Sequence, residues 1–213
     1  FNPEVNHHPV DMKKNFVIAA LIVWNLVVMG LFVLVVIRSR SSSNDRSRIA
    51  AAVAANTEND AMQEFTFSAG ENLSGDAAPQ VGGRGLAIAA VIDTQTKDGV
   101  IISQGGDWHG YTLYVQGGEL FFAVRRDQTL TIVPGGQIAE GRRTITATWT
   151  KAGNLDLAMD GRSLATGKAE GGIKITPLGG LEIGSDSGGA VGPYKVPSRF
   201  GGIIHTASLR TTP

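Results

Sequence analysis

The stretch YTLYVQGGELFFAVR, residues 111–125, has the pattern of two β-strands joined by a tight turn. Apolar and polar positions alternate in 111–116 and again in 119–125, which is the period of strands with one buried face. Gly117 and Gly118 lie between them, and glycine accepts the positive φ angles that two-residue hairpin turns require. A phosphate-binding loop would need a helix after its glycines, and no helical pattern follows. These glycines therefore predict a β-hairpin.

The same pattern continues on both sides of the hairpin. Short runs with strand periodicity recur from residue 63 almost to the C-terminus, separated by turns that carry Gly, Asn or Asp. The expected strands are 63–67, 86–92, 99–104, 111–116, 119–125, 129–133, 143–150, 155–160, 162–167, 180–185 and 201–210. Many short strands with glycine-rich turns predict an all-β domain over 63–213, either a β-sandwich or a barrel.

An uncharged run of 22 residues, FVIAALIVWNLVVMGLFVLVVI at 16–37, precedes this domain. A helix of that length spans about 33 Å, which matches the hydrocarbon core of a bilayer. We expect a transmembrane helix between an N-terminal tail (1–15) and a linker (38–62), because the run is too long for a cleaved signal peptide. Asn25 and Gly30 are candidate contacts with another helix, although a single tolerated Asn is an equal alternative.

Composition and charge limit the classes of function. The chain has 19 basic and 19 acidic residues, so no basic excess indicates nucleic-acid binding. It has no cysteine, which excludes disulfides, thiolate metal ligands and cysteine nucleophiles. Four Arg follow the apolar run and two Lys precede it, which favours a cytoplasmic domain. Against this, an N-terminal anchor usually carries an extracytoplasmic domain, so we expect a single-pass protein of the bacterial inner membrane with a periplasmic sandwich.

Several motifs in order resemble a laminin-G-like, concanavalin A-like jelly roll. They are GVIISQGG (99–106), GYTLYVQGGELFFAV (110–124), RTITATWT (143–150), LDLAMDGRSLATG (155–167), LEIGSD (181–186) and FGGIIHTASLR (200–210). The segment is similar in particular to the C-terminal β-sandwich of bacterial arylsulfatases. The resemblance implies an antiparallel sandwich and no sulfatase activity, because sulfatases place their nucleophile, in a C/S-x-P-x-R motif, in a separate larger domain. This chain has no such motif.

Candidate chemistry is sparse. Asp156 and Asp160 share one side of a strand, but Asp160 precedes a glycine and is better explained as a turn residue. His205 lies in an expected strand, where a packing or surface role is favoured over catalysis. Asp107 and Asp186, with Asp98, are weak calcium candidates because they form no dense acidic cluster. We therefore expect no enzyme activity and no cofactor.

The segment DWHGY (107–111) holds the best candidates for a contact surface. Trp108, His109 and Tyr111, with Tyr194 as a second choice, could seat a partner protein or stack on a sugar. We expect a non-enzymatic accessory or stabilising subunit of a larger bacterial membrane complex, for which a respiratory or photosynthetic complex is one guess. Its partners would be other subunits and the lipid bilayer, with no nucleic acid. The alternative is a membrane-anchored carbohydrate-binding module with a glycan as ligand.

Overall fold

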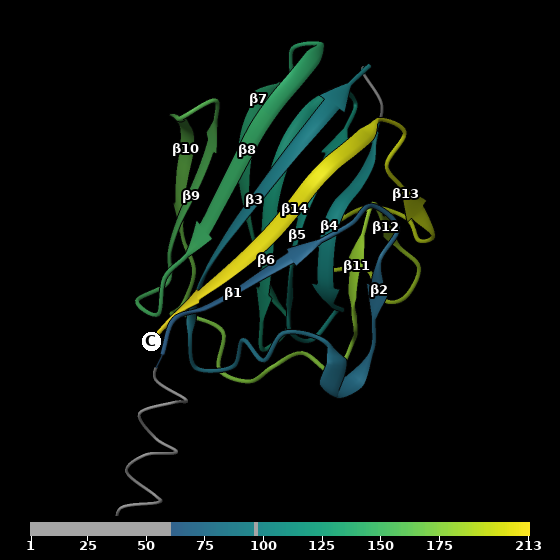
Figure 1. The fold of residues 1–213 in the computed structure, drawn as a ribbon. Coiled ribbons are helices and arrows are strands. Elements are labelled where there is room, and N and C mark those ends of the chain that lie inside the picture. The colour runs from purple at the N-terminus through teal and green to yellow at the C-terminus, as the bar shows by residue number, and fades with distance from the viewer. Residues whose placement is uncertain (1–60, 96–97) are drawn as a thin grey trace, which may run out of the picture. The chain divides into compact units, whose positions relative to one another are not determined.

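The computed structural model describes residues 61–95 and 98–213, which fold into a two-layered β-sandwich (Figure 1). The predicted N-terminal tail, the transmembrane helix with Asn25 and Gly30, and nearly all of the predicted linker lie outside the described residues. These therefore stay predictions. Within the part of the chain that the structure describes, no helix is long and apolar enough to cross a membrane.

One layer is a six-stranded antiparallel sheet, which we call the β3 sheet. In spatial order it contains β1 (Gln63–Phe67), β14 (Ile203–Thr212), β3 (Gly85–Thr94), β8 (Gly141–Trp149), β9 (Asn154–Met159) and β10 (Arg162–Lys168). Strands from both ends of the domain are thus neighbours, because β1 pairs with the last strand. This arrangement holds the start and the end of the domain together.

The other layer, the β5 sheet, also has six antiparallel strands. Its order is β2 (Asn72–Leu73), β11 (Leu181–Ile183), β4 (Gly99–Gly105), β5 (Gly110–Gln116), β6 (Glu119–Arg126) and β7 (Thr129–Gln137). A short 3-10 helix (Gly75–Ala77) follows β2, and a small third sheet pairs β12 (Ser185–Asp186) with β13 (Ser198–Arg199).

The strands match the sequence pattern closely. Each of the eleven expected runs lies on a strand of the structure, and 180–185 divides at Gly184, whose φ is 81°, into β11 and β12. The central hairpin is confirmed, because Gly117 and Gly118 have φ angles of 62° and 78° between β5 and β6. The turn role of Asp160 is confirmed as well, with φ at 51°. The two-residue strands β2 and β13 are too short to leave a period in the sequence.

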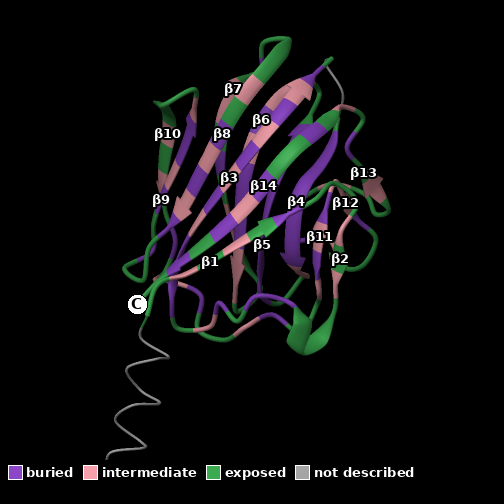
Figure 2. Ribbon diagram, in the orientation of Figure 1, coloured by how far each residue is buried: buried purple, intermediate pink, exposed green. Residues whose placement is uncertain are grey.

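The core fills the space between the two sheets. Leu113 and Phe122, which pair across β5 and β6, are fully buried there, as the alternation in the hairpin predicts. Trp149 is also buried there, and its Nε1–H donates to the carbonyl of Gly171 at 3.0 Å. Buried positions therefore recur along the strands of both layers, as Figure 2 shows.

The β5 sheet is covered on its outer face too. Tyr114 and Val100 point away from the core and pack with Phe121 and with Tyr194, which lies in the segment between β12 and β13. We call this segment (187–197) the Tyr194 strap. Because it covers part of the outer face, β4 and β5 are buried along nearly their whole length (Figure 2). A strand that is covered on both faces has apolar residues at consecutive positions, which explains the sequence GVIIS at the start of β4.

Segments from distant parts of the sequence are joined at the end of the sandwich where β1 begins, which we call the base. The Arg84 Nη1–H donates to the carbonyl of Ala61 at 2.7 Å and to the hydroxyl of Thr211 at 3.2 Å. The backbone N–H of Gly83, the residue before Arg84, donates to the carbonyl of Ile173 at 2.8 Å. This bond joins Gly83 to the segment between β10 and β11. In Figure 1 the end of β4 lies at this same end of the domain. The base thus carries both the start of the domain and the loop that follows β4.

Candidate functional site

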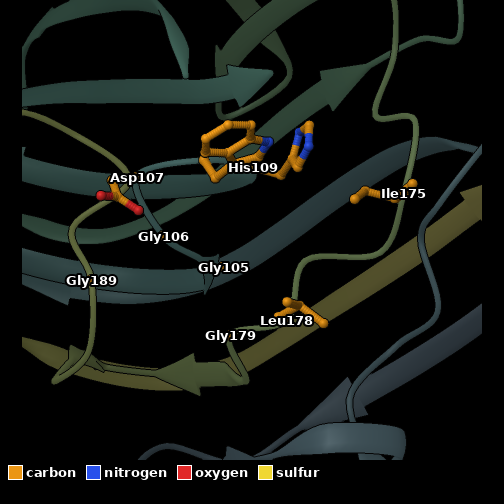
Figure 3. Close-up of a pocket in the computed structure, with 9 residues that line it drawn as sticks. Gly105, Gly106, Asp107, His109, Ile175, Leu178, Gly179 and Gly189 are labelled. Carbon is orange, nitrogen blue, oxygen red and sulfur yellow. The ribbon is translucent and has the colours of Figure 1, made fainter. Parts of the chain in front are cut away.

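An open hollow of about 530 Å³ lies at the base between two connecting segments (Figure 3). One is the loop 106–109 between β4 and β5, which we call the Trp108 loop, and the other is 169–180 between β10 and β11, while Gly189 of the Tyr194 strap borders the same hollow. The hollow, which we call the Trp108 groove, is lined by Gly105, Gly106, Asp107, Trp108, His109, Ile175, Leu178, Gly179 and Gly189. Three of its side chains are large, apolar and exposed, with exposed fractions of 57% for Trp108, 54% for Ile175 and 99% for Leu178.

Glycine backbone allows the segments around the groove to approach closely. Gly105 has a φ of 105°, and a Cβ at this position would lie 2.2 Å from the carbonyl oxygen of His109. A Cβ on Gly179 would lie 2.6 Å from the carbonyl oxygen of Gly105. No side chain fits at either position without moving the backbone. These glycines are therefore structural requirements of the groove and have a different role from the turn glycines of the central hairpin.

His109 fixes the Trp108 loop to the turn between β6 and β7. Its ring is 7% exposed, and Nδ1 accepts a hydrogen bond from the backbone N–H of Asp127 at 3.3 Å. The backbone N–H of Gln128 donates to the carbonyl of Trp108 at 2.9 Å. Asp127 and Gln128 both have positive φ, as a tight hairpin turn requires. The loop is thus held at two successive residues, while the Trp108 side chain is left exposed.

Two carboxylates near the groove, those of Asp127 and Asp107, differ in their partners. Asp127 pairs with Lys174, whose Nζ lies 2.8 Å from Oδ2, and this hydrogen bond is the main reason why the pKa of Asp127 is lowered. Asp107, which is exposed, has no ion pair or hydrogen bond to any described residue. Figure 3 shows its carboxylate on the side of the groove away from Ile175 and Leu178. The groove therefore has an apolar side and a free carboxylate.

Tyr111 does not reach this surface, so its predicted contact role is wrong. It is fully buried, and its hydroxyl donates to Oε1 of Gln104 at 2.7 Å. Burial raises the pKa of the Tyr111 hydroxyl. The physical reason is strand parity: Tyr111, Leu113 and Val115 all face the core, whereas Tyr114 lies on the opposite face. Of the predicted contact residues, Trp108 and His109 line the groove.

Tyr194 is in contact with another part of the domain. Its ring is half-buried against Tyr114, with ring centroids 4.9 Å apart. The Tyr194 hydroxyl donates to Oδ2 of Asp186 at 2.7 Å, and the hydroxyl of Ser103 donates to the same oxygen at 3.1 Å. Asp186 is buried, and its removal from water raises the pKa of its carboxyl despite these donors. Tyr194 and Asp186 therefore fasten the strap, and neither lines the Trp108 groove.

The remaining candidates are separated from one another. Asp98 accepts a hydrogen bond from the N–H of Gly118 at 3.2 Å. Residues 61–95 and 98–213 contain no group of three His, Cys, Asp or Glu side chains that could hold a metal ion. His205 forms a surface cluster, with Nε2 2.8 Å from Oδ2 of Asp93 and 3.0 Å from Arg142 Nη2. The hydrogen bond from His205 is the main cause of the lowered pKa of Asp93.

Sequence reasoning missed Ile175 and Leu178, which are two of the three large apolar side chains of the groove. Both lie in IKITPLGG (173–180), which belongs to no strand. Large apolar residues in a loop rich in Pro and Gly are unusual, because loops normally expose polar side chains. The apolar residues of this loop were therefore the signal that the sequence offered. Only the fold shows that this segment lies beside the Trp108 loop.

The fold is similar to that of solved laminin-G-like domains. Domains LG4-5 of the mouse laminin alpha1 chain match with a TM-score of 0.54 and 18% identity over 69% of this chain, which spans 40% of that chain. Weaker matches are the Ruminococcus gnavus sialidase CBM40 bound to sialyllactose (TM-score 0.45, 15% identity, 70% of this chain and 90% of that chain) and the binding domain of botulinum neurotoxin DC in complex with SialylT (0.42, 11%, 70% and 41%).

This similarity confirms the predicted all-β antiparallel sandwich of the concanavalin A-like, laminin-G-like type. At such low identity it shows the fold alone. No model of a protein family and no curated protein matches the chain. The resemblance to the C-terminal segment of bacterial arylsulfatases therefore stays a prediction.

Proposed function

We propose that this chain is a non-enzymatic, membrane-tethered accessory subunit of a larger bacterial membrane complex, and that its sandwich docks on a partner protein through the Trp108 groove. One observation carries the proposal: Trp108, Ile175 and Leu178 expose large apolar side chains around a single hollow. Exposed apolar residues that are scattered need no explanation, whereas a cluster around a hollow is typical of an interface. Tryptophan is also among the residues that most often dominate binding energy.

The predicted anchor would keep the domain close to partners in the same membrane. The groove lies at the base, the end of the described domain at which the Arg84 side chain donates to the carbonyl of Ala61. A tether raises the local concentration of the domain near partners in the same membrane to the millimolar range. A small apolar contact, weak in free solution, then suffices for stable association.

Replacing Leu178 by Asp tests the proposal. Leu178 is 99% exposed, so the substitution should change the free energy of unfolding by no more than about 0.5 kcal/mol. It should nevertheless release the partner, because a charge would have to be buried at the interface. The measurement is native mass spectrometry of complexes extracted from the source membrane with mild detergent. We expect the wild-type chain to extract with partner subunits and the variant to extract mainly alone.

Ile203→Asp is the matched control. Ile203 is also apolar and 54% exposed, but it begins β14, whose other end lies at the base. The control variant should keep the partner. Extraction of the wild-type chain as a monomer, or equal retention of the partner by both variants, would contradict the proposed docking surface.

A second function, membrane-anchored carbohydrate binding, is favoured by one feature of the groove. An indole beside a free carboxylate could stack on a sugar ring and accept a hydrogen bond from its hydroxyls. However, Asp107 and His109 are the only groove residues with strongly polar side chains, and the His109 ring already faces Asp127. Protein docking therefore comes first. Glycan-array binding that is lost in Trp108→Ala would reverse this order.

A further inference from the structure

We propose that the partner segment presents a large aliphatic side chain beside an Arg or a Lys, so that the aliphatic group packs on Ile175 and Leu178 and the cation pairs with Asp107. This inference rests on the proposed function, since it specifies the chemistry of the docking partner. Three observations carry it: the composition of the groove, its remaining charge and its fixed backbone.

The charges around the groove select a cation. Asp127 already pairs with Lys174 at 2.8 Å, Arg126 also acts on it, and His109 faces it, with Nε2 3.6 Å from Oδ1. Asp107 is left without a hydrogen bond or ion pair to any residue of 61–95 or 98–213. Complementary charge at the edge of an interface fixes the register of the partner and disfavours competitors of the wrong sign. A partner with an acidic residue at this point would be repelled.

The arrangement requires two neighbouring partner residues. Asp107 lies across the hollow from Ile175 and Leu178 in Figure 3, so one short side chain cannot satisfy both sides. The hollow of about 530 Å³ lies within the usual range of small-ligand sites and accepts more than one side chain. Gly105 and Gly179 hold the walls in backbone contact, which lowers the entropy that binding has to remove.

A bilayer surface is the competing occupant, because exposed Trp and Leu side chains also suit a membrane interface. Bacterial inner membranes expose anionic headgroups, which attract basic segments and repel carboxylates. The groove places Asp107, which has no ion pair to any described residue, across from Ile175 and Leu178, and Lys174 is already paired with Asp127. The charge pattern therefore favours a basic protein segment over a lipid surface.

The test uses the full chain in phosphatidylcholine nanodiscs, with its tryptophan indoles labelled with ¹⁵N. Three dipeptides serve as probes: acetyl-Leu-Arg-amide, acetyl-Leu-Glu-amide and acetyl-Gly-Arg-amide. The indole N–H signal of Trp108 reports the groove, while that of buried Trp149, which is bonded to Gly171, is the internal control. We expect Leu-Arg to shift only the Trp108 signal, saturably and at millimolar concentration, with an affinity about fivefold higher than that of Leu-Glu. Gly-Arg should bind more weakly than Leu-Arg because it lacks the aliphatic group.

Asp107→Asn identifies the source of this preference. In the variant, Leu-Arg and Leu-Glu should bind with equal affinity, and the Trp149 signal should stay in place. Equal affinities in the wild-type chain, a preference that persists in Asp107→Asn, or no shift with any dipeptide would overturn the inference. A Trp108 signal that moves on replacing phosphatidylcholine by phosphatidylglycerol, and not with the dipeptides, would assign the groove to the bilayer. The partner release expected for Leu178→Asp is independent of these outcomes, so the proposed function and its partner chemistry can fail separately.

Discussion

The Trp108 loop and the Tyr194 strap are two connecting segments that both carry aromatic residues, and they use them in opposite ways. In the strap, the Tyr194 ring packs on Tyr114 and its hydroxyl donates to buried Asp186. In the Trp108 loop, the buried group is His109, which is hydrogen-bonded to the turn at Asp127. The Trp108 indole remains 57% exposed.

This difference shows that exposure of an aromatic residue depends on which neighbour anchors the loop. In the strap, the Tyr194 hydroxyl is needed for stability, because the buried carboxylate of Asp186 requires hydrogen-bond donors. The Trp108 loop has a separate anchor in His109, so its aromatic ring is not needed for stability. An aromatic side chain that contributes little to folding and remains exposed in a rigid loop is available for binding.

The largest expected effect is a contrast in stability between Tyr194→Ala and Trp108→Ala. Removing Tyr194 deletes a ring contact and leaves Asp186 short of a donor, so we expect a loss of about 3 kcal/mol in the free energy of unfolding. Removing Trp108 should change it by no more than about 0.5 kcal/mol. Urea denaturation of the full chain in nonionic detergent, followed by far-ultraviolet circular dichroism, measures both.

Tyr194→Phe separates the two contributions in the strap. It keeps the ring against Tyr114 and removes only the hydroxyl, so its cost should lie between those of Tyr194→Ala and Trp108→Ala. A loss for Trp108→Ala as large as that for Tyr194→Ala would show that the indole supports the fold, and the comparison would fail.

A smaller effect is expected from Gly105→Ala, with its neighbour Gly106→Ala as control. A methyl group at Gly105 would enter a positive φ of 105° and collide with the carbonyl oxygen of His109, whereas at Gly106 it meets only an ordinary contact at 3.4 Å. We expect Gly105→Ala to cost about 2 kcal/mol and Gly106→Ala less than about 0.5 kcal/mol. Thermal unfolding of the two variants side by side measures the difference. Equal melting temperatures would mean that the loop backbone is free to adjust.

The sequence predicted the sandwich well because its signals are local. Most of the longer strands between 63 and 212 repeat a two-residue period, and the turns at Gly117 and Asp160 carry residues that accept positive φ. The order of the strands was not predicted, because a local period does not say which strands are neighbours. The sequence of the strap has no hydrophobic period. The burial of β4 and β5 on both faces could therefore not be predicted and is seen only in the fold.

The candidate site was predicted in part, since Trp108 and His109 line the groove and Tyr111 does not. Strand parity already placed Tyr111 and Tyr114 on opposite faces, but parity does not say which face is the core. Ile175 and Leu178 are 67 and 70 residues from Trp108 in the sequence, and no local pattern connects such distant segments. Sites built from several loops require the fold before they can be recognised.

The smallest expected effect is a pH dependence in the strap. Loss of hydration raises the pKa of Asp186 in the folded chain above its ordinary value of 3.8. The unfolded chain therefore releases this proton first as pH rises, and the wild-type chain loses stability relative to Asp186→Asn until pH passes the folded pKa. We expect the free energy of unfolding of Asp186→Asn minus that of the wild-type chain to increase above pH 3.8 and then to level off.

Asp93→Asn should give the opposite sign and serves as the control. The hydrogen bond from His205 lowers the pKa of Asp93, so the wild-type advantage over Asp93→Asn is present above pH 3.8 and is lost as pH falls through the lowered pKa. Urea titrations of the three proteins between pH 3 and 7 separate the two carboxyls, because the ionisations of groups that do not interact with the substituted carboxyl cancel in each difference. A flat or falling difference for Asp186→Asn would mean that Tyr194 and Ser103 compensate fully for the burial of Asp186. The strap would then be held by charge-assisted hydrogen bonds, and ionisation of Asp186 would not oppose folding.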